Sequence, residues 1–263
     1  EGLGCEIVEG DITRKETLKR ALEGVETVLH LAAVVLSHDV AAYQEVNLEG
    51  TRNLLEASVS AGARHFIYVS SASVVYSRST PYSRSKRQAE ELVRGRADIR
   101  WTIIRPTLVY GDGGGAELLL LWNYLLRFPR VLPLVGDGRA KKRPVHVDDL
   151  SHGMLAIPGN ERAYGQTYNL SGGETITMEG LVRLLLRQSD RSPLIVHVPV
   201  FVCELGAWVL SKIMRRPPLT KSAVRGVTQD ADLDPGSSMQ DLGYAPLGVS
   251  EGLPRSFPLG RPT

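Results

Sequence analysis

Short runs of strand-forming residues alternate with amphipathic stretches through the first two thirds of this 263-residue chain. The strands expected from these runs are 5–8, 25–31, 65–70 and 101–104, and the helices expected between them are 16–23, 40–60 and 81–93. The strands lack a polar alternate face, which is typical of a parallel sheet covered on both sides by helices. We therefore predict a doubly wound α/β fold.

The pattern changes after Gly111. Residues 113–115 are three glycines and predict a loop, and the strongly apolar residues 118–126 predict a helix. From Met178 onward the pattern predicts two or three helices with loops, so we expect a smaller C-terminal lobe packed on the sheet domain.

Charge and cysteine content exclude several classes of protein. Lys and Arg number 31 against 29 Asp and Glu, so a nucleic-acid binder that works through bulk charge is not expected. Cys5 and Cys203 lie far apart without a Cys/His cluster, which favours reduced core thiols and predicts no metal site. No apolar run is long enough to span a bilayer, and we expect a cytoplasmic protein.

Tyr82 and Lys86 lie four residues apart, on one face at the start of the expected helix 81–93. An ammonium about 5 Å from a phenol favours the phenolate, which lowers the tyrosine pKa by roughly two units. Such a pair suits a proton shuttle near neutral pH. The spacing alone also arises by chance, and a solvent-exposed Tyr and Lys is then the simpler interpretation.

The segment Val69–Tyr76 reads V-S-S-A-S-V-V-Y and ends the expected strand in hydroxyl groups. Ligands of open α/β sheets bind at the carboxyl edge of the strands. A serine at this edge can hydrogen-bond a substrate oxygen beside the tyrosine. The alternative is that the hydroxyls merely terminate the strand.

Further motifs follow one another in order along the chain. They are G-D-I at 10–12, H-L-A-A at 30–33, N-L-E-G-T-R-N at 47–53, R-P-T-L-V-Y-G at 105–111, V-H-V-D-D at 145–149 and G-Y-A-P at 243–246. Together with Ser70-Ser71 and the Tyr82/Lys86 pair, this order resembles the extended short-chain dehydrogenases/reductases, the NAD-dependent epimerase/dehydratase superfamily. The serine segment is most similar to the 3β-hydroxysteroid and sterol dehydrogenase branch.

The resemblance implies a role for each matching residue. Tyr82 would be the general acid/base, Ser71 would polarise the substrate oxygen with Ser73 as the reserve, and Lys86 would lower the tyrosine pKa and bind the nicotinamide ribose. The cofactor would be NAD or NADP. The residues expected to contact it are Asp11, Ile12, Leu31, Ala32, Ala33, Tyr82, Lys86, Pro106 and Val109.

The resemblance implies an oxidoreductase that moves hydride between the nicotinamide and a secondary alcohol or ketone, with a sterol-like substrate. A sugar-nucleotide epimerase or dehydratase is the alternative, and Arg139, Arg143 and Arg215 would then be parts of a diphosphate clamp. A third hypothesis for the function is a non-catalytic, cofactor-binding scaffold subunit. A small-molecule partner is expected, and a homodimer is left open.

The family's glycine-rich G-x-x-G-x-x-G turn does not occur at the start of this chain. We therefore expect a doubly wound sheet that lacks its first β-α-β unit, with strand 5–8 as the family's third strand. Residues 1–175 would form the truncated dinucleotide-binding domain, with a lobe insertion near 113–140, and residues 176–263 the substrate-binding lobe. As a fragment, these residues alone are expected to bind dinucleotides weakly.

Several other features have simpler structural explanations. His146 with Asp148 and Asp149 is expected to be structural, with Asp149 capping the next helix. His30 is expected to be a packed core histidine, and residues 141–143 (K-K-R) to form a solvated loop. The apolar residues 198–210, followed by basic ones, could lie on a membrane surface, but a helix of the substrate lobe is the favoured interpretation.

Overall fold

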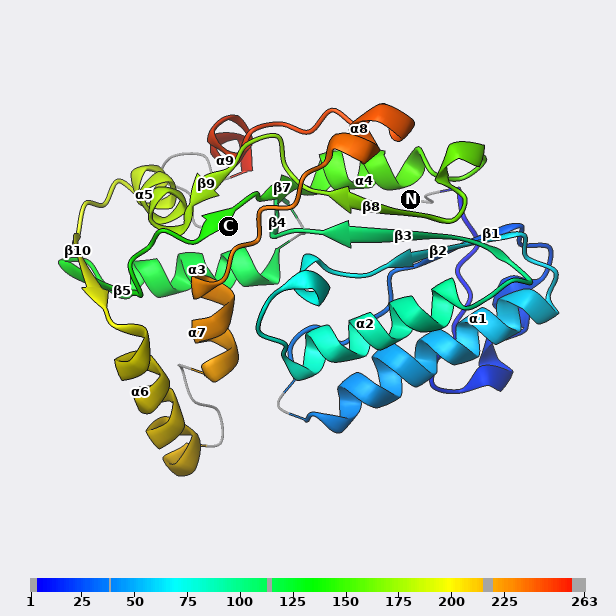
Figure 1. Cartoon of the computed structure of the whole chain (residues 1–263), viewed down its shortest axis with the longest axis horizontal. Coiled ribbons are helices and arrows are strands. Elements are labelled where there is room, and N and C mark those ends of the chain that lie inside the picture. Colours follow the sequence, from blue (N-terminus) through cyan, green and yellow to red (C-terminus); the bar gives the residue numbers. More distant parts are fainter. Residues whose placement is uncertain (1–3, 38, 113–114, 215–219, 257–263) are drawn as a thin grey trace. The chain divides into compact units, whose positions relative to one another are not determined.

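The computed structural model describes residues 4–37, 39–112, 115–214 and 220–256 (Figure 1). The chain divides into two compact units. Unit 1 contains Glu1–Val74, Ser79–Ile104 and Ile157–Tyr168, and unit 2 contains Val75–Arg78, Arg105–Ala156 and Asn169–Thr263. Residues 105–156 therefore cluster with the C-terminal part. From the sequence we expected them within the dinucleotide-binding domain 1–175, with a lobe insertion near 113–140. The binding roles assigned to the two halves stay predictions.

A four-stranded sheet with the order β1-β2-β3-β8 is the framework of unit 1. Its strands are β1 (Thr27–His30), β2 (His65–Val69), β3 (Arg100–Pro106) and β8 (Gln166–Leu170). β1 pairs with β2 and β2 with β3 in parallel. The strands predicted over 25–31, 65–70 and 101–104 are confirmed, and so is the α/β class with a parallel sheet. β8 was not predicted.

One prediction for the first 25 residues is wrong. Residues 5–8 form no strand, and the side chain of Ile7 is 88% exposed. A strand needs a neighbour for its N–H and C=O groups, and none of the described residues pairs with this segment. Residues 16–23 are helical as predicted, in the form of two short 3₁₀ helices, Lys15–Leu18 and Arg20–Leu22.

The helices of unit 1 are close to those expected. The predicted helix 40–60 consists of a π-helix, η3 (Tyr43–Gly50), which continues into α1 (Thr51–Ser60). Gly62 follows α1 with a φ of 82°, a left-handed conformation that favours glycine. α2 (Pro81–Arg94) matches the helix predicted over 81–93.

The start of α2 is fixed by a capping box. The Thr80 hydroxyl accepts a hydrogen bond from the Ser83 N–H, and the Ser83 hydroxyl accepts one from the Thr80 N–H. Pro81 occupies the first helical position, where no N–H is needed. Because α2 begins at a fixed residue, the positions of Tyr82 in its first turn and of Lys86 one turn later are also fixed.

One hydrophobic core holds unit 1 together. α1 and α2 lie side by side and pack with η3 (Figure 1). Their apolar side chains share a core with side chains of the sheet. The buried members are Leu18, Leu22, Val28, Leu48, Leu55, Ala63, Phe66, Tyr68, Ala89, Val93, Ile99 and Ile103.

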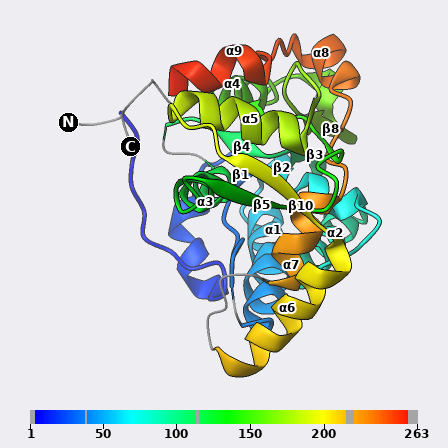
Figure 2. The ribbon, with the colours of Figure 1, turned by 90° about the vertical axis from the view of Figure 1, so that its left-hand side faces the viewer.

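Unit 2 is built from short strand pairs and helices. β5 (Val131–Val135) pairs in parallel with β10 (Leu194–Val198), β4 (Val109–Tyr110) with β7 (Val145–His146), and β6 (Lys141–Lys142) antiparallel with β9 (Ile176–Thr177). The α-helices are α3 (Ala116–Leu126), α4 (Val147–Leu155), α5 (Met178–Gln188), α6 (Val200–Ile213), α7 (Lys221–Thr228), α8 (Gly236–Leu242) and α9 (Val249–Ser256). Figure 2 shows β5 beside β10 and α6 beside α7.

The C-terminal part contains more structure than was predicted. α3 confirms the helix expected over 118–126, whereas β5 and β10 were not predicted. The expected glycine loop includes residues 113 and 114, which lie outside the described residues. Among the helices of the described part, none is long and apolar enough to cross a bilayer.

Candidate active site

The serine segment follows β2 at the carboxyl end of the sheet. The Ser70 N–H donates to the Ile104 carbonyl oxygen at 2.7 Å, which extends the pairing between β2 and β3 by one residue. Ser71 then leads into a short 3₁₀ helix, η4 (Ala72–Val75). The Ser71 Oγ lies 2.9 Å from the Ser73 Oγ and accepts a hydrogen bond from the Ser73 N–H at 3.2 Å. If Ser73 donates its hydroxyl proton to Ser71, the Ser71 proton is left to donate elsewhere.

Lys86 is buried beneath this segment, with 2% of its surface exposed. Its Nζ donates to the carbonyl oxygen of Val69 at 2.6 Å and lies 4.3 Å from the centroid of the Tyr68 ring. Burial lowers the pKa of the Lys86 ammonium to about 7, and the charge of Glu90 only partly opposes this. The Lys86 ammonium therefore loses its proton more readily than that of an exposed lysine.

Arg87, the next residue of α2, holds the other end of the serine segment. Its Nε donates to the Val74 carbonyl oxygen at 2.9 Å, and its Nη2 donates to the same oxygen. Lys86 and Arg87 therefore fix the backbone before and after Ser70–Ser73. Sequence reasoning missed Arg87, since an exposed arginine on a helix carries no periodic signal.

Tyr82 lies in the first turn of α2 and is half-buried. Its ring meets the Tyr43 ring edge-on, with 6.0 Å between the centroids. The Ser85 hydroxyl donates to the Tyr82 carbonyl oxygen at 2.8 Å. Ser71, in the turn after β2, and Tyr82 and Lys86, on α2, thus all belong to unit 1.

Asn47 joins the first turn of α2 to the loop after β1. Its Oδ1 accepts from the Val34 N–H at 2.8 Å, and its Nδ2 donates to the Val34 carbonyl oxygen at 3.0 Å. The same Nδ2 donates to the Ser85 Oγ at 3.1 Å. The motif at 47–53 was recognised from the sequence, but the bracing role of its asparagine was not.

His30 is a buried core histidine, as predicted. Its Nε2 lies 2.9 Å from the Thr51 hydroxyl, which itself donates to the Asn47 carbonyl oxygen. The histidine therefore donates to Thr51. Burial lowers the pKa of His30 to about 3, with the Lys86 charge as the lesser cause, so His30 is neutral.

Asp11 and Ile12 form a separate part of unit 1. The Asp11 Oδ1 accepts from the N–H and the hydroxyl of Thr13 at 2.9 and 2.8 Å, and these bonds are the main reason why its pKa is lowered. The Ile12 carbonyl oxygen accepts from the Asn53 Nδ2 at 2.9 Å. A Cβ on Gly50 would lie 2.8 Å from the Ile12 side chain, so glycine permits this close approach.

The residues after β1 that are expected to contact the cofactor begin at Leu31. Leu31 and Ala32 are exposed at the carboxyl end of β1, and Asn47 holds Val34 behind them. This edge of the sheet is where ligands bind in open α/β folds. Pro106 and Val109, also expected to contact the cofactor, belong to unit 2. The other residues expected to contact the cofactor belong to unit 1, so the expected contacts do not all lie in one unit.

His146 is structural, but the cap was assigned to the wrong residue. His146 is the N-cap of α4, and its Nδ1 accepts from the Asp148 N–H at 3.2 Å. The Asp149 carboxylate instead accepts from the Leu247 N–H at 2.9 Å. The His146 Nε2 lies 3.0 Å from the Ser256 hydroxyl, beside a pocket of about 300 Å³. No cluster of metal ligands occurs among the described residues.

Two further expectations are wrong. Lys142 is buried, and its Nζ donates to the carbonyl oxygens of Gly226 and Gln229. Arg143 pairs with Asp232 at 2.7 Å, so residues 141–143 are a structural brace and not a solvated loop. Cys5 is exposed, and of the two thiols only Cys203 is buried.

The fold and these residues define a class of protein. A parallel α/β sheet with serine hydroxyls at its carboxyl edge, followed by a helix that carries Tyr82 and a buried Lys86, is the arrangement of Rossmann-type short-chain dehydrogenases and reductases. The model of the NAD dependent epimerase/dehydratase family matches residues 1–171. The chain belongs to this family.

Curated relatives and solved structures agree with this membership. The chain is 28% identical over 290 residues to 3beta-hydroxysteroid-dehydrogenase/decarboxylase isoform 2 of Arabidopsis thaliana, covering 95% of this chain and 51% of the relative. It is 28% identical over 281 residues to 3-beta-hydroxysteroid dehydrogenase of Mycolicibacterium neoaurum, covering 93% of this chain and 76% of the relative. The chain thus spans about half of the Arabidopsis protein, and 64% of another curated relative.

A crystal structure of dTDP-glucose 4,6-dehydratase from Streptomyces venezuelae, with NAD bound, has a similar fold. The TM-score is 0.72 at 25% identity, and the match covers 94% of this chain and 77% of that one. The fold class predicted from the sequence is therefore confirmed as Rossmann-type.

Proposed function

We propose that this chain belongs to an NAD(P)-dependent oxidoreductase that transfers hydride between a nicotinamide cofactor and a secondary alcohol or ketone. A hydrophobic, sterol-like substrate is the favoured one. The two relatives named as 3β-hydroxysteroid dehydrogenases support this choice of substrate. The family description and the NAD in the Streptomyces structure support the choice of cofactor.

The observation that carries the proposal is the burial of Lys86 beside the serine segment. A lysine costs free energy in such a place, and a surface Tyr–Lys pair would not require it. When bound, the nicotinamide accepts or supplies the hydride. Tyr82 then removes or returns the hydroxyl proton, and Ser71 donates a hydrogen bond to the same substrate oxygen. Lys86 contributes positive charge near the phenol and a donor for the ribose.

The other cofactor contacts are assigned by their places in the fold. Asp11 and Ile12 would hold the adenine end, since a carboxylate and a backbone N–H can pair with an amino group and a ring nitrogen. Leu31, Ala32 and Ala33 would lie beside the nicotinamide half. Pro106 and Val109 complete the set.

A sugar-nucleotide epimerase or dehydratase is the second candidate, favoured by the likeness to the Streptomyces enzyme. Two of the three arginines proposed for its diphosphate clamp give no support. Arg143 is already paired with Asp232, and Arg215 lies outside the described residues. Arg139 is exposed. A non-catalytic scaffold is disfavoured because Ser71, Tyr82 and Lys86 are all present. A cytoplasmic location and a homodimer stay predictions.

The test is an assay of the whole protein for reduction of NAD or NADP with 3β-hydroxysteroids, followed by absorbance of the reduced nicotinamide. Tyr82→Phe should lower turnover by about 10²- to 10⁴-fold while the fold is retained. The matched control is Tyr164→Phe, because Tyr164 packs on His65 at the opposite end of β2. Near-normal turnover of Tyr82→Phe would contradict the assignment. Turnover of nucleotide sugars without net redox would favour the second candidate.

A further inference from the structure

α6 exposes a broad apolar face to solvent. Its large exposed side chains include Phe201 at 70%, Trp208 at 49% and Ile213 at 76%. The full set is Phe201, Val202, Leu205, Trp208, Val209 and Ile213. At 100° per residue these positions cover an arc of about 140° on one side of the helix. Cys203 and Ala207 on the other side are buried, and α6 packs against α7.

This burial pattern differs from that of a helix inside a substrate lobe. The apolar side chains that were expected to face a protein interior face outward instead, and the small ones face inward. Isolated exposed apolar residues are ordinary, but a contiguous set of large ones indicates a surface that is covered by another body.

The sequence that begins at Leu205 in α6 carries charges of one sign over a continuous stretch. Residues 205–229 contain no Asp or Glu and five basic residues: Lys212, Arg215, Arg216, Lys221 and Arg225. Since the whole chain carries only +2, the rest of it is net acidic. Glu204, the acidic residue of α6, is paired with Arg78 at 3.5 Å.

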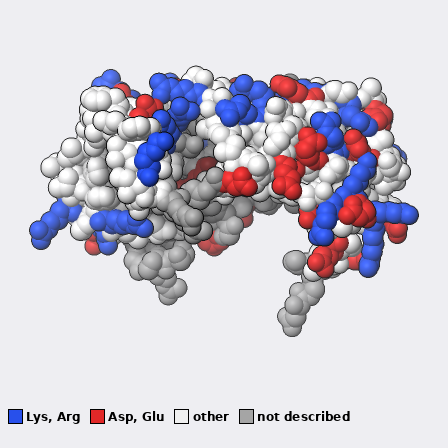
Figure 3. Space-filling view, turned by 90° about the horizontal axis from the view of Figure 1, so that it is seen from below, with Lys and Arg blue, Asp and Glu red and all other residues white. Residues whose placement is uncertain are grey.

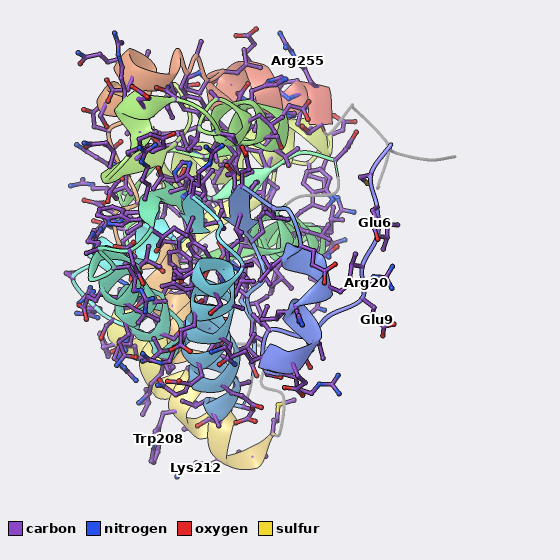
Figure 4. The ribbon with its side chains drawn as sticks, turned by 90° about the vertical axis from the view of Figure 1, so that its right-hand side faces the viewer. Glu6, Glu9, Arg20, Trp208, Lys212 and Arg255 are labelled. Atoms are coloured by element: carbon purple, nitrogen blue, oxygen red, sulfur yellow. The ribbon has the colours of Figure 1, made fainter. Side chains whose placement is uncertain are left out.

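Trp208 and Lys212 project together from the far end of α6 (Figure 4). In Figure 3 the left part of the surface, over α6, is mostly uncharged with Lys and Arg at its border. A long lysine side chain can reach outward past such an apolar face while its ammonium stays in a polar layer.

We propose that α6 docks this protein on the surface of an anionic lipid bilayer. The apolar face enters the boundary between headgroups and acyl chains, and the exposed Lys212 and Lys221 meet the lipid phosphates. Attachment of this kind is peripheral and reversible. This inference does not rest on the proposed oxidoreductase activity.

A second copy of the chain fits the surface less well than a bilayer does. A two-fold interface places the same patch of both subunits together, so the basic residues around α6 would meet their own equivalents. Like charges at an interface cost free energy unless an opposite charge balances them. A bilayer with anionic lipids supplies that opposite charge.

The test is co-sedimentation of the full protein with vesicles of phosphatidylcholine and phosphatidylserine in a ratio of about two to one. Phosphatidylcholine vesicles are the neutral comparison. We expect binding to the mixed vesicles that weakens as salt is raised, together with quenching of Trp208 by lipids brominated in their acyl chains. The doubly substituted F201S/W208S protein should bind on the order of tenfold less.

Two further variants separate the contribution of charge from non-specific adsorption through any exposed apolar residue. The charge variant Lys212→Glu with Lys221→Glu should reduce binding to mixed vesicles about tenfold at low salt. The matched control is Leu155→Ser, because Leu155 on α4 is 70% exposed but lies outside the α6 surface. This control should bind like the unchanged protein.

Vesicle binding that F201S/W208S leaves unchanged would overturn the proposal. So would the absence of vesicle binding by a folded protein. If that protein is instead dimeric by analytical ultracentrifugation, and F201S/W208S makes it monomeric, α6 is an interface between copies and the bilayer proposal is wrong.

Discussion

Arg87 donates two hydrogen bonds from its guanidinium to the carbonyl oxygen of Val74, at the end of the serine segment opposite to the one that Lys86 holds. Arg87 touches no reacting atom in the proposed mechanism, so it is a positioning residue. We expect Arg87→Met to lower kcat roughly tenfold with a smaller change in the cofactor Kd, because Ser71 loses its fixed place.

Arg84→Met is the matched control for this prediction. Arg84 is exposed on the same helix, and its removal should leave kcat within about twofold of normal. Steady-state kinetics of both variants, with a thermal melt to show that they fold, decide the matter. Equal kcat values for the two variants would show that the Val74 contact does not position the serine.

Lys86 should make stability depend on pH above neutrality. Its folded pKa is about 7, below the unfolded value of 10.5, so the unfolded chain binds more protons between these values. The free energy of unfolding should therefore rise between pH 7 and pH 9, by roughly 2 kcal/mol from this group. Urea titrations of the wild type and of Lys86→Met at both pH values measure this, and the variant should lack that increment.

Lys19→Met is the control for the Lys86 prediction, because Lys19 is an exposed lysine in the same unit. It should keep the wild-type pH dependence. If the free energy of unfolding rises equally for Lys86→Met and the wild type between pH 7 and pH 9, the buried lysine does not release its proton in that range.

Asn47 should contribute more to stability than its neighbour in the same motif. Asn47 is buried and makes three side-chain hydrogen bonds, two to Val34 and one to Ser85. Asn47→Ala removes all three bonds and leaves the half-buried N–H and carbonyl of Val34 without this partner, so it should cost about 3 kcal/mol of unfolding free energy. Asn53→Ala removes one half-buried bond, to Ile12, and should cost about 1 kcal/mol. Chemical denaturation of both variants compares the two costs, and equal costs would contradict the prediction.

Lys142 and Lys141 should respond differently to the same substitution. Lys142→Met leaves the carbonyl oxygens of Gly226 and Gln229 without their buried donor and should cost about 2 kcal/mol of unfolding free energy. Lys141 is exposed, and Lys141→Met should change stability by less than about 0.5 kcal/mol. Thermal unfolding of the two single variants is the measurement. If Lys141→Met is destabilised and Lys142→Met is unaffected, the assignment of the stabilising contacts to Lys142 is wrong.

The parallel strands of unit 1 could be predicted because their sequences combine high strand propensity with burial on both faces. β2 (H-F-I-Y-V) is buried at four of its five positions, and turn residues mark its ends. β5 and β10 could not be predicted in this way. β5 contains Pro133, and its partner β10 has only exposed and half-buried positions, so neither strand has a continuous buried pattern.

The strand predicted over 5–8 shows the opposite error. Its residues favour strand locally, but propensity alone does not supply a hydrogen-bonding neighbour. The start of α2 was easier, because a proline near the start of a helix, here Pro81, is a signal local in sequence.

The candidate site was predictable where a motif spans adjacent residues, and less so where residues meet across elements. Ser71, Tyr82 and Lys86 were named from short patterns, and their roles stay predictions. The contacts from Arg87 to Val74 and from Asn47 to Val34 join segments that are 13 residues apart in the chain. No spacing rule identifies such contacts, since they depend on how the helices pack on the sheet.

The π-helical turns of Tyr43–Gly50 affect how this chain can be compared with others. A π turn contains about one more residue than an α turn. This segment therefore holds more residues than an α-helix with the same number of turns would. Deleting one residue between Tyr43 and Asn47 would change the rotation of Asn47 relative to Val34, whose backbone it holds. An insertion or deletion in this short stretch can therefore decide whether the loop after β1 is braced, even where every flanking residue is identical.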